Sequence, residues 1–265
     1  MITRLWLVGC GNMGGAMLRR WIATGTIIPR NVTVINRADR ALPEGVTQGR
    51  VFPEGRLPDA VMLAMKPQQI DDVAAAQASR LAGVPILISI LAGVDHASLA
   101  RRFDSESIVR AMPNLPVALG KGVVALHADR VAEDARSRVT ALMTPLGLVE
   151  WIDDPALFDL VTALAGSGPA FLFRFIDALA VAGATLGLGK DQAARLALAT
   201  VQGAAAMAAN ASDSPAMLAD RVASKGGSTR AGLDVLDDQK ALERLLLETL
   251  AAATQRNAEM AAAAR

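Results

Sequence analysis

The chain has 265 residues, of which 52% are hydrophobic, enough for the core of one large domain or two ordinary ones. Its 27 basic and 26 acidic residues leave a formal net charge of +1 and are spread along the chain, so we expect no nucleic-acid partner and no anionic membrane surface. One cysteine and two histidines exclude an internal disulfide and a metal site. Uncharged apolar runs such as residues 178–189 are shorter than the roughly 20 residues of a bilayer span, and no basic-then-apolar leader is present. We therefore expect a cytoplasmic protein.

The first half of the chain is predicted to alternate strands with helices. Apolar runs flanked by turn signals predict strands over residues 4–8, 32–36, 60–65, 85–90 and 107–112. Because these runs are continuously apolar, they favour a parallel sheet covered on both faces. After the first strand, Met17 and Trp21 belong to an apolar stripe at helical spacing, and Gly25 suits the position beyond the last turn.

The turn between the first strand and this helix has the sequence GCGNMG, which places Gly9, Gly11 and Gly14 in G-x-G-x-x-G spacing. The first glycine permits the tight turn, the second lets the backbone approach a pyrophosphate, and the third lets the helix pack on the strand. The helix N-terminus adds free N–H groups and a partial positive charge. We expect these glycines, with Asn12 and Met13, to bind a dinucleotide, although an ordinary tight turn would use glycine too.

The end of the second strand indicates which dinucleotide is bound. An NAD site usually places Asp or Glu there to accept from the ribose 2′-hydroxyl, whereas this strand ends with Asn36 and Arg37, and Arg40 follows. An arginine at this position suits a 2′-phosphate. We therefore expect NADP(H) to be preferred over NAD(H), the alternative being that Arg37 is a surface charge close to Asp39.

Beyond about residue 150, segments rich in alanine and leucine replace the strands. They predict helices over residues 155–166, 169–189, 190–211 and 239–263. Pro155, preceded by two aspartates, suits the opening of the first of these helices. We expect two domains, residues 1–153 and 154–265, with the apolar faces of the second at a subunit interface.

Several segments together resemble the pyrroline-5-carboxylate reductase family, and they occur in that family's order. They are VGCGNMGGAML (8–18), VINR (34–37), VMLAMKPQQ (61–69), LISILAGV (87–94), VRAMPNLPVALGKGVVAL (109–126), ALAGSGPAFLF (163–173) and VASKGGSTRAGL (222–233). The resemblance implies an α/β Rossmann-like dinucleotide-binding domain followed by an all-α helical dimerisation domain. It implies reduction of 1-pyrroline-5-carboxylate to L-proline by hydride from NAD(P)H, in a homodimer that assembles further, for example into a decamer.

By the same resemblance, the loop of Ser224, Gly226, Gly227, Ser228 and Thr229 binds the substrate carboxylate, and Thr229 hydrogen-bonds the ring nitrogen. Successive N–H groups in a glycine-permitted turn form a concave anion site. We expect Thr229 to lie at or near the start of the next helix and to cap it. The alternative is a simple connection between two helices, and the loop is expected to serve both purposes.

Two further matched segments follow strands. Ala64, Lys66 and Pro67 follow the third predicted strand, and Ala92 and Gly93 follow the fourth, so both sets are expected at carboxyl ends of strands, where open α/β sheets bind ligands. The alternative interpretation of Lys66 is that it is only a charged residue on the surface.

The segment GSGP (166–169) is part of the family resemblance. The alternative interpretation is a plain helix break capped by Ser167. Where the family has Thr, Asp and Pro, this chain has Leu115, Val181 and Lys225. These departures leave the substrate affinity and the preferred ring size open.

Other functions have sequence signatures of their own. The chain has no tyrosine, which excludes dehydrogenases with a Tyr-Lys proton donor. A β-hydroxyacid dehydrogenase would need a lysine within residues 169–189, which contain none. Two alternatives stay open. One is a reductase of a six-membered cyclic imine, because one methylene changes binding by only about 1–3 kcal/mol. The other is a non-catalytic NADP(H)-binding protein of the same fold.

Overall fold

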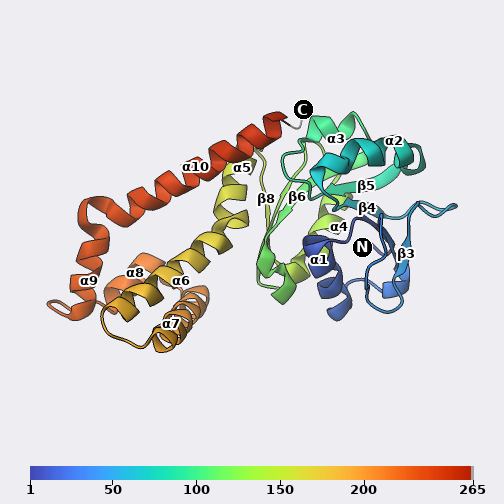
Figure 1. Ribbon diagram of the computed structural model, residues 1–265. Coiled ribbons are helices and arrows are strands. Elements are labelled where there is room, and N and C mark those ends of the chain that lie inside the picture. Colours follow the sequence, from blue (N-terminus) through green and yellow to red (C-terminus); the bar gives the residue numbers. More distant parts are fainter. Residues whose placement is uncertain (264–265) are drawn as a thin grey trace. The chain divides into compact units, whose positions relative to one another are not determined.

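The computed structural model describes residues 1–263, which form two compact units (Figure 1). The first unit is Met1–Ser167 together with the chain from Ala253 onward, and the second is Gly168–Ala252. The strands are β1 (Leu5–Val8), β2 (Val32–Ile35), β3 (Thr47–Gly49), β4 (Ala60–Leu63), β5 (Val84–Ser89), β6 (Ser105–Pro113), β7 (Gly122–His127) and β8 (Gly147–Trp151). The helices are α1 (Asn12–Ala23), α2 (Ile70–Leu81), α3 (His96–Ala100), α4 (Glu133–Met143), α5 (Phe158–Val161), α6 (Gly168–Thr185), α7 (Lys190–Asn210), α8 (Pro215–Arg221), α9 (Ser228–Asp237) and α10 (Ala241–Ala263).

The first unit is built on one sheet whose strand order is β3-β2-β1-β4-β5-β6-β7-β8. Strand β1 lies parallel to both β2 and β4, with Leu5 opposite Val32 on one side and Ala60 on the other. The chain order reverses at this point, which is where doubly wound sheets open a crevice at the carboxyl ends of their strands. The expected Rossmann-like fold is therefore confirmed, and its switch point lies beside β1.

Helices cover both faces of the sheet, as the continuously apolar strands require. Helices α1 and α4 bury their apolar sides against one face, and α2 and α3 cover the other. Met17, Leu18 and Trp21 of α1 are fully buried, and each contributes about 1.5–3 kcal/mol through the apolar area it removes from water. Gly25 follows the helix with a φ of 69° and donates to the carbonyl of Ile22, so the predicted helix end is confirmed.

Three strands were not predicted, and two of them change the sheet. Strand β7 runs antiparallel to β6, so the sheet is mixed rather than wholly parallel, and β8 extends it parallel to β7. Along β8, half-buried and exposed positions alternate, because the strand lies at the edge of the sheet. The third, β3, has three residues and carries no apolar run.

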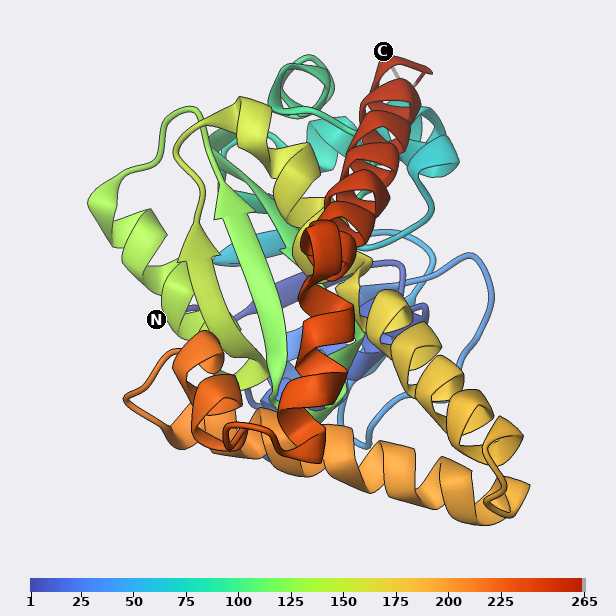
Figure 2. The same cartoon turned by 90° about the vertical axis from the view of Figure 1, so that its left-hand side faces the viewer.

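The second unit is entirely helical in the described residues, with α6 and α7 joined by a short turn (Figure 2). The two helices pack closely at Gly183, where a Cβ would lie 3.6 Å from the Cβ of Ala193, an ordinary packing distance. Ala193, Ala197 and Ala223 are the unit's fully buried residues in the described part of the chain. Large apolar side chains such as Phe173 and Leu247, which are 59% and 69% exposed, lie at its surface.

The helical run bends at residues 166–169. A π-helical segment, Thr162–Gly166, ends before Ser167, and α6 begins at Gly168 with Pro169 in its first turn. Ser167 keeps helical backbone angles, with φ of −83° and ψ of −22°, so it does not have the extended conformation of a capping residue. Single π-helical turns of this kind are frequent at functional sites. The run of helix begins at Pro155, in a turn capped by Asp154, whose side chain accepts from the N–H of Ala156, and the predicted opening is confirmed.

This helical run, Pro155–Thr185, is long and apolar enough to cross a membrane by length and composition. It has 31 residues, its apolar stretch has a mean hydropathy of 1.5, and most side chains of that stretch lie at the surface. The expectation from the sequence covered uncharged runs only, so it missed a run that reaches this length with charged residues inside it. The run contains charged residues such as Arg174 and Asp177, which pair at 3.5 Å. For this reason no uncharged stretch of the sequence reaches the length of the run.

Candidate active site

A cavity of about 760 Å³ opens at the carboxyl ends of β1, β2 and β4, at the switch point of the sheet. Its floor is the glycine-rich turn after β1, one wall is the turn after β2, and the other is the segment after β4 with the first turns of α2. The predicted site residues that line it are Gly9, Gly11, Asn12, Met13, Asn36, Arg37, Ala64 and Lys66. Gly14, Pro67, Ala92 and Gly93 do not line it.

The three glycines of the turn differ in what surrounds them. Gly9 has a φ of 84°, and a Cβ on it would lie 2.7 Å from Cα of Met65, so this position admits no side chain. At Gly14, a Cβ would lie 3.1 Å from Cβ of Ala64, which is the close packing of helix on sheet. At Gly11, a Cβ would meet nothing within 4 Å. The glycine at position 11 therefore leaves space in the cavity itself.

Gly11 is also the residue directly before α1, at its N-cap position, and no side chain caps that end of the helix. The first N–H groups of α1 are free of intrahelical partners by the geometry of any helix start. Together with the helix dipole, they suit a phosphate or pyrophosphate. The cavity floor thus combines space for an anion with donors for it.

Asn36 supports this floor from β2. It is buried, its Oδ1 accepts from the N–H of Cys10 at 2.9 Å, and its Nδ2 donates to Oε1 of Gln48 at 3.0 Å. Gln48 also accepts from the N–H of Arg40 at 3.2 Å. Asn36 therefore ties the glycine-rich turn to the turn after β2, and Gln48 is a supporting residue that no sequence pattern indicated.

Three arginines, Arg37, Arg40 and Arg50, line the same wall of the cavity. Arg37 pairs with Asp72 of α2 at 2.5 Å, and Arg50 donates to the backbone carbonyl of Arg37. Arg50 lies just after β3, the strand without an apolar run, so sequence analysis missed it. The wall is therefore more basic than the motif alone predicts.

Cys10 is a residue of the glycine-rich turn itself, and its side chain is almost fully buried. Burial raises the pKa of its thiol, and the positive charges of Arg19 and Arg40 offset only part of that effect. A thiol with a raised pKa is a poor nucleophile near neutral pH. Cys10 is thus a packing residue of the turn, as a small buried side chain suggests.

The residues after β4 and β5 have different surroundings. Ala64 and Lys66 face the cavity, whereas Pro67 starts the short turn that leads into α2. Gly93 has a φ of 74° and lies against α10, where a Cβ would be 3.3 Å from the carbonyl oxygen of Met260. The segment after β5 therefore contacts the returning C-terminal helix within the first unit.

In the second unit, residues 224–229 form a tight turn followed by α9. The N–H of Gly227 donates to the carbonyl of Ser224 at 3.0 Å, and Gly226 has a φ of 73°. Lys225, the intervening residue, has no positive φ, which makes this a type II turn. A Cβ on Gly227 would lie 2.6 Å from Oγ of Ser224, so the second glycine is needed for that hydroxyl to occupy its place.

Helix α9 begins at Ser228, with Gly227 before it and no side chain capping it. The expectation that Thr229 caps this helix was therefore wrong, because Thr229 is already its second helical residue. The hydroxyls of Ser228 and Thr229 are exposed, as are the first turn's backbone donors by the geometry of a helix start. This end of α9 offers hydroxyl and N–H donors to an anion.

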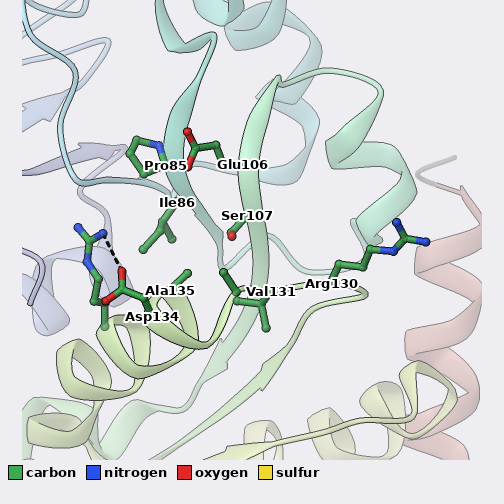
Figure 3. A pocket seen from close by; sticks show the side chains of 10 residues that line it. Pro85, Ile86, Glu106, Ser107, Arg130, Val131, Asp134 and Ala135 are labelled. Atoms are coloured by element: carbon green, nitrogen blue, oxygen red, sulfur yellow. Dashed lines mark hydrogen bonds and ion pairs between the residues drawn. The ribbon is translucent and has the colours of Figure 1, made fainter.

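A second hollow, of about 390 Å³, lies over the first residues of β5 and β6 and the start of α4 (Figure 3). Glu106 and Ser107 come from β6, and Asp134 of α4 pairs with Arg138 at 3.5 Å. It lies at the amino ends of these strands and has no glycine-rich turn. The hollow therefore lacks the features that make the first cavity a nucleotide site.

Comparisons with known proteins agree over nearly the whole chain. Residues 155–260 match the family described as pyrroline-5-carboxylate reductase dimerisation, and residues 4–93 match the family described as NADP oxidoreductase coenzyme F420-dependent. The chain is 36% identical to a pyrroline-5-carboxylate reductase of Synechocystis, over 98% of this chain and 99% of that one. It is 32% identical to the enzyme of that name from Arabidopsis thaliana, over 97% and 95%.

A solved structure of a pyrroline-5-carboxylate reductase from Coxiella burnetii is also similar. It has 32% sequence identity and a TM-score of 0.88, and the match covers 98% of this chain and 99% of that one. Sequence and fold therefore point to the same relatives.

Proposed function

The chain belongs to the pyrroline-5-carboxylate reductase family and is an oxidoreductase that reduces 1-pyrroline-5-carboxylate to L-proline, and we propose that it takes hydride from NADPH in preference to NADH. The cofactor proposal rests on the basic wall of the cavity. Arg37 lies in the turn after β2, and Arg50 lies beside that turn. Arginine at this position accommodates a 2′-phosphate, and no carboxylate ends β2 to accept from a 2′-hydroxyl.

The residues that would hold the cofactor fit it. Gly9, Gly11, Asn12, Met13 and Gly14 form the pyrophosphate turn, in which the space beside Gly11 takes the close approach of phosphate. Asn36 and Arg37 serve the ribose and its phosphate. Ala64 and Lys66, which line the cavity, are assigned to the nicotinamide end, together with Pro67, Ala92 and Gly93, which follow β4 and β5 outside the cavity lining. We assign these functions to residues 1–153, and dimerisation and substrate binding to residues 154–265.

The cofactor supplies hydride to the imine carbon, and the ring nitrogen takes a proton, so that the C=N bond becomes the C–N bond of a secondary amine. The residues of the loop hold the substrate. Ser224, Gly226, Gly227 and Ser228 bind its carboxylate through hydroxyls and the N–H groups at the start of α9. Thr229 donates or accepts at the ring nitrogen and relays the proton from water.

This assignment suits the side chains that are present. The region from residue 154 onward has no histidine or tyrosine in the sequence, so it offers no strong general acid to a carbonyl oxygen. A cyclic imine is protonated more easily than a ketone and needs mainly to be aligned, which is catalysis by positioning. The exposed hydroxyl of Thr229 is sufficient for that role.

Self-association is suggested by the dimerisation family that residues 155–260 match. We propose a homodimer formed through the helical region, and further assembly of such dimers, as in a decamer. The support is the amount of apolar surface in the second unit: Phe173, Val181 and Leu247 are all more than half exposed. A second copy would cover this surface, including the apolar run Pro155–Thr185, without any membrane. A cytoplasmic location fits the single reduced Cys10.

The test is oxidation of NADPH by the purified protein with 1-pyrroline-5-carboxylate, beside NADH and beside the six-membered homologue of the substrate. We expect the highest kcat/KM for NADPH with the five-membered ring. Equal kcat/KM for NADPH and NADH would overturn the cofactor preference. Binding of NADPH with no turnover of either ring would instead indicate the non-catalytic alternative.

A further inference from the structure

Each of two arginines at the nucleotide cavity is already paired with a carboxylate. Nη2 of Arg37 lies 2.5 Å from Oδ2 of Asp72, and Nη2 of Arg50 lies 3.6 Å from Oδ1 of Asp39. Asp72 lines the cavity together with both arginines. A negative charge thus occupies the guanidinium to which the proposed function assigns the 2′-phosphate.

Asp72 is held where it is by its own helix. It lies in the first turn of α2, where the helix dipole favours a negative charge. Arg37 extends to it from the end of β2, and the side chains of the two residues are 65% and 70% exposed. Ion pairs with this exposure are weak because water screens them. A dianionic phosphate therefore exchanges with the carboxylate at modest cost.

Arg50 is placed to share the phosphate. Its guanidinium donates to the carbonyl of Arg37, and this hydrogen bond fixes Arg50 beside the turn after β2. The ion pair of Arg50 with Asp39, at 3.6 Å, is longer than that of Arg37 with Asp72, at 2.5 Å. Guanidinium groups bind phosphate oxygens through two parallel N–H donors. Two such groups side by side would divide the three free oxygens of a 2′-phosphate between them.

We propose that Asp72 competes with the 2′-phosphate for Arg37, and that Arg50 receives the phosphate beside it, so that this carboxylate limits how strongly the protein prefers NADPH to NADH. The proposal rests on the NADP(H) assignment above. NADH leaves the pair of Arg37 and Asp72 intact, whereas NADPH breaks it and places its phosphate close to a carboxylate. Asp72 is therefore a specificity-determining residue that acts against the phosphorylated cofactor.

The experiment measures the binding of two probes, adenosine 2′,5′-bisphosphate and 5′-AMP, by calorimetric titration of the full chain. Asp72→Asn should lower the Kd of the bisphosphate by about two- to fivefold, the range of an exposed ion pair, and leave that of 5′-AMP unchanged. Arg50→Gln should raise the Kd of the bisphosphate alone, and Arg50→Lys should restore part of the affinity.

The neighbouring residue provides a matched control. Asp71 lies in the same turn of α2 but pairs with Arg102 at 2.6 Å and does not line the cavity, so Asp71→Asn should change neither Kd. The proposal is overturned if Asp72→Asn weakens or does not change bisphosphate binding, since the carboxylate would then orient Arg37 or be idle. It is equally overturned if Asp72→Asn weakens 5′-AMP, since Asp72 would then bind the ribose.

Arg37→Ala separates this inference from the function on which it rests. If that variant binds the bisphosphate as well as the unmodified protein does, the assignment of the 2′-phosphate to this wall fails altogether. If Arg37→Ala weakens the bisphosphate and Asp72→Asn does not strengthen it, the cofactor assignment stands and the competition by Asp72 fails.

Discussion

Gly9 lies so close to the backbone of Met65 that a Cβ on it would be 2.7 Å from the neighbouring Cα. Because its φ is 84°, a side chain is opposed by local strain as well. We expect Gly9→Ala to lower the free energy of unfolding by about 2 kcal/mol or more, as measured by denaturant titration.

The second glycine of the turn should behave differently. At Gly11 a Cβ would meet nothing within 4 Å, so Gly11→Ala should keep the free energy of unfolding within about 0.5 kcal/mol. It should nevertheless weaken NADPH about tenfold, because the added methyl occupies the place of the pyrophosphate. Unchanged NADPH affinity in Gly11→Ala would contradict the assignment of the turn to the pyrophosphate.

Thr229 should contribute through its hydroxyl alone. Thr229→Val keeps the shape of the side chain and should lower kcat/KM for 1-pyrroline-5-carboxylate about 10- to 100-fold, the effect of one hydrogen bond to a charged group. The Kd of NADPH, measured by fluorescence titration, should not change. Thr229→Ser is the matched control and should retain most of the activity, and full activity of the valine variant would remove Thr229 from the mechanism.

Lys225 occupies the second position of a type II turn, where proline is favoured. Lys225→Pro should raise the free energy of unfolding by about 0.4–1 kcal/mol, because proline restricts the unfolded chain. Lys225→Ala separates the charge from the backbone effect. If Lys225 attracts the substrate carboxylate, both variants raise KM equally, and if it points outward, neither does.

The pKa of Cys10 predicts a dependence of stability on alkaline pH. Burial raises the pKa of this thiol above its ordinary value of 9.0, so the folded protein resists ionisation that the unfolded chain undergoes. Its contribution is fully present below the unfolded pKa and is lost as the pH rises through the folded one. The free energy of unfolding should fall above about pH 9. Cys10→Ala should fall less steeply, and identical pH profiles would contradict the shift.

The exposed apolar residues of the second unit predict the effect of a charge. Leu247→Glu should shift the protein from dimer toward monomer in size-exclusion chromatography with light scattering, because each copy would bury a charge at the interface. Leu148→Glu, at an exposed leucine of β8 in the first unit, is the control and should leave the dimer intact. A dimer that survives Leu247→Glu would place the interface elsewhere.

The parts of the fold that the sequence predicts are those with strong local patterns. Strands β1, β2, β4, β5 and β6 are largely apolar runs, and all were predicted within two residues of their observed ends. Strand β7 is an apolar run too and was nevertheless missed, so an apolar run is not always recognised as a strand. Strand β8 has no fully buried position, and β3 is polar and short.

The candidate site divides in the same way. The glycine-rich turn and the arginine after β2 are local motifs, and both face the cavity. Arg50, just after β3, and Asp72 of α2 line the same cavity, and Gln48 of β3 supports it through Asn36. These contacts join residues that are far apart in the chain. Such contacts depend on the pairing of strands and helices in three dimensions, which no single segment encodes.

The described chain leaves the first unit after Ser167 and returns to it at Ala253, where Asn257 donates to the carbonyl of Asp159 and Met260 lies against Gly93. In practical terms, the second unit is joined to the first by a chain connection at each of its ends. A protease must cut twice to release it. A premature stop codon shortly before residue 253 would remove the part of α10 that belongs to the first unit, so a truncation at the end of the chain would affect both units.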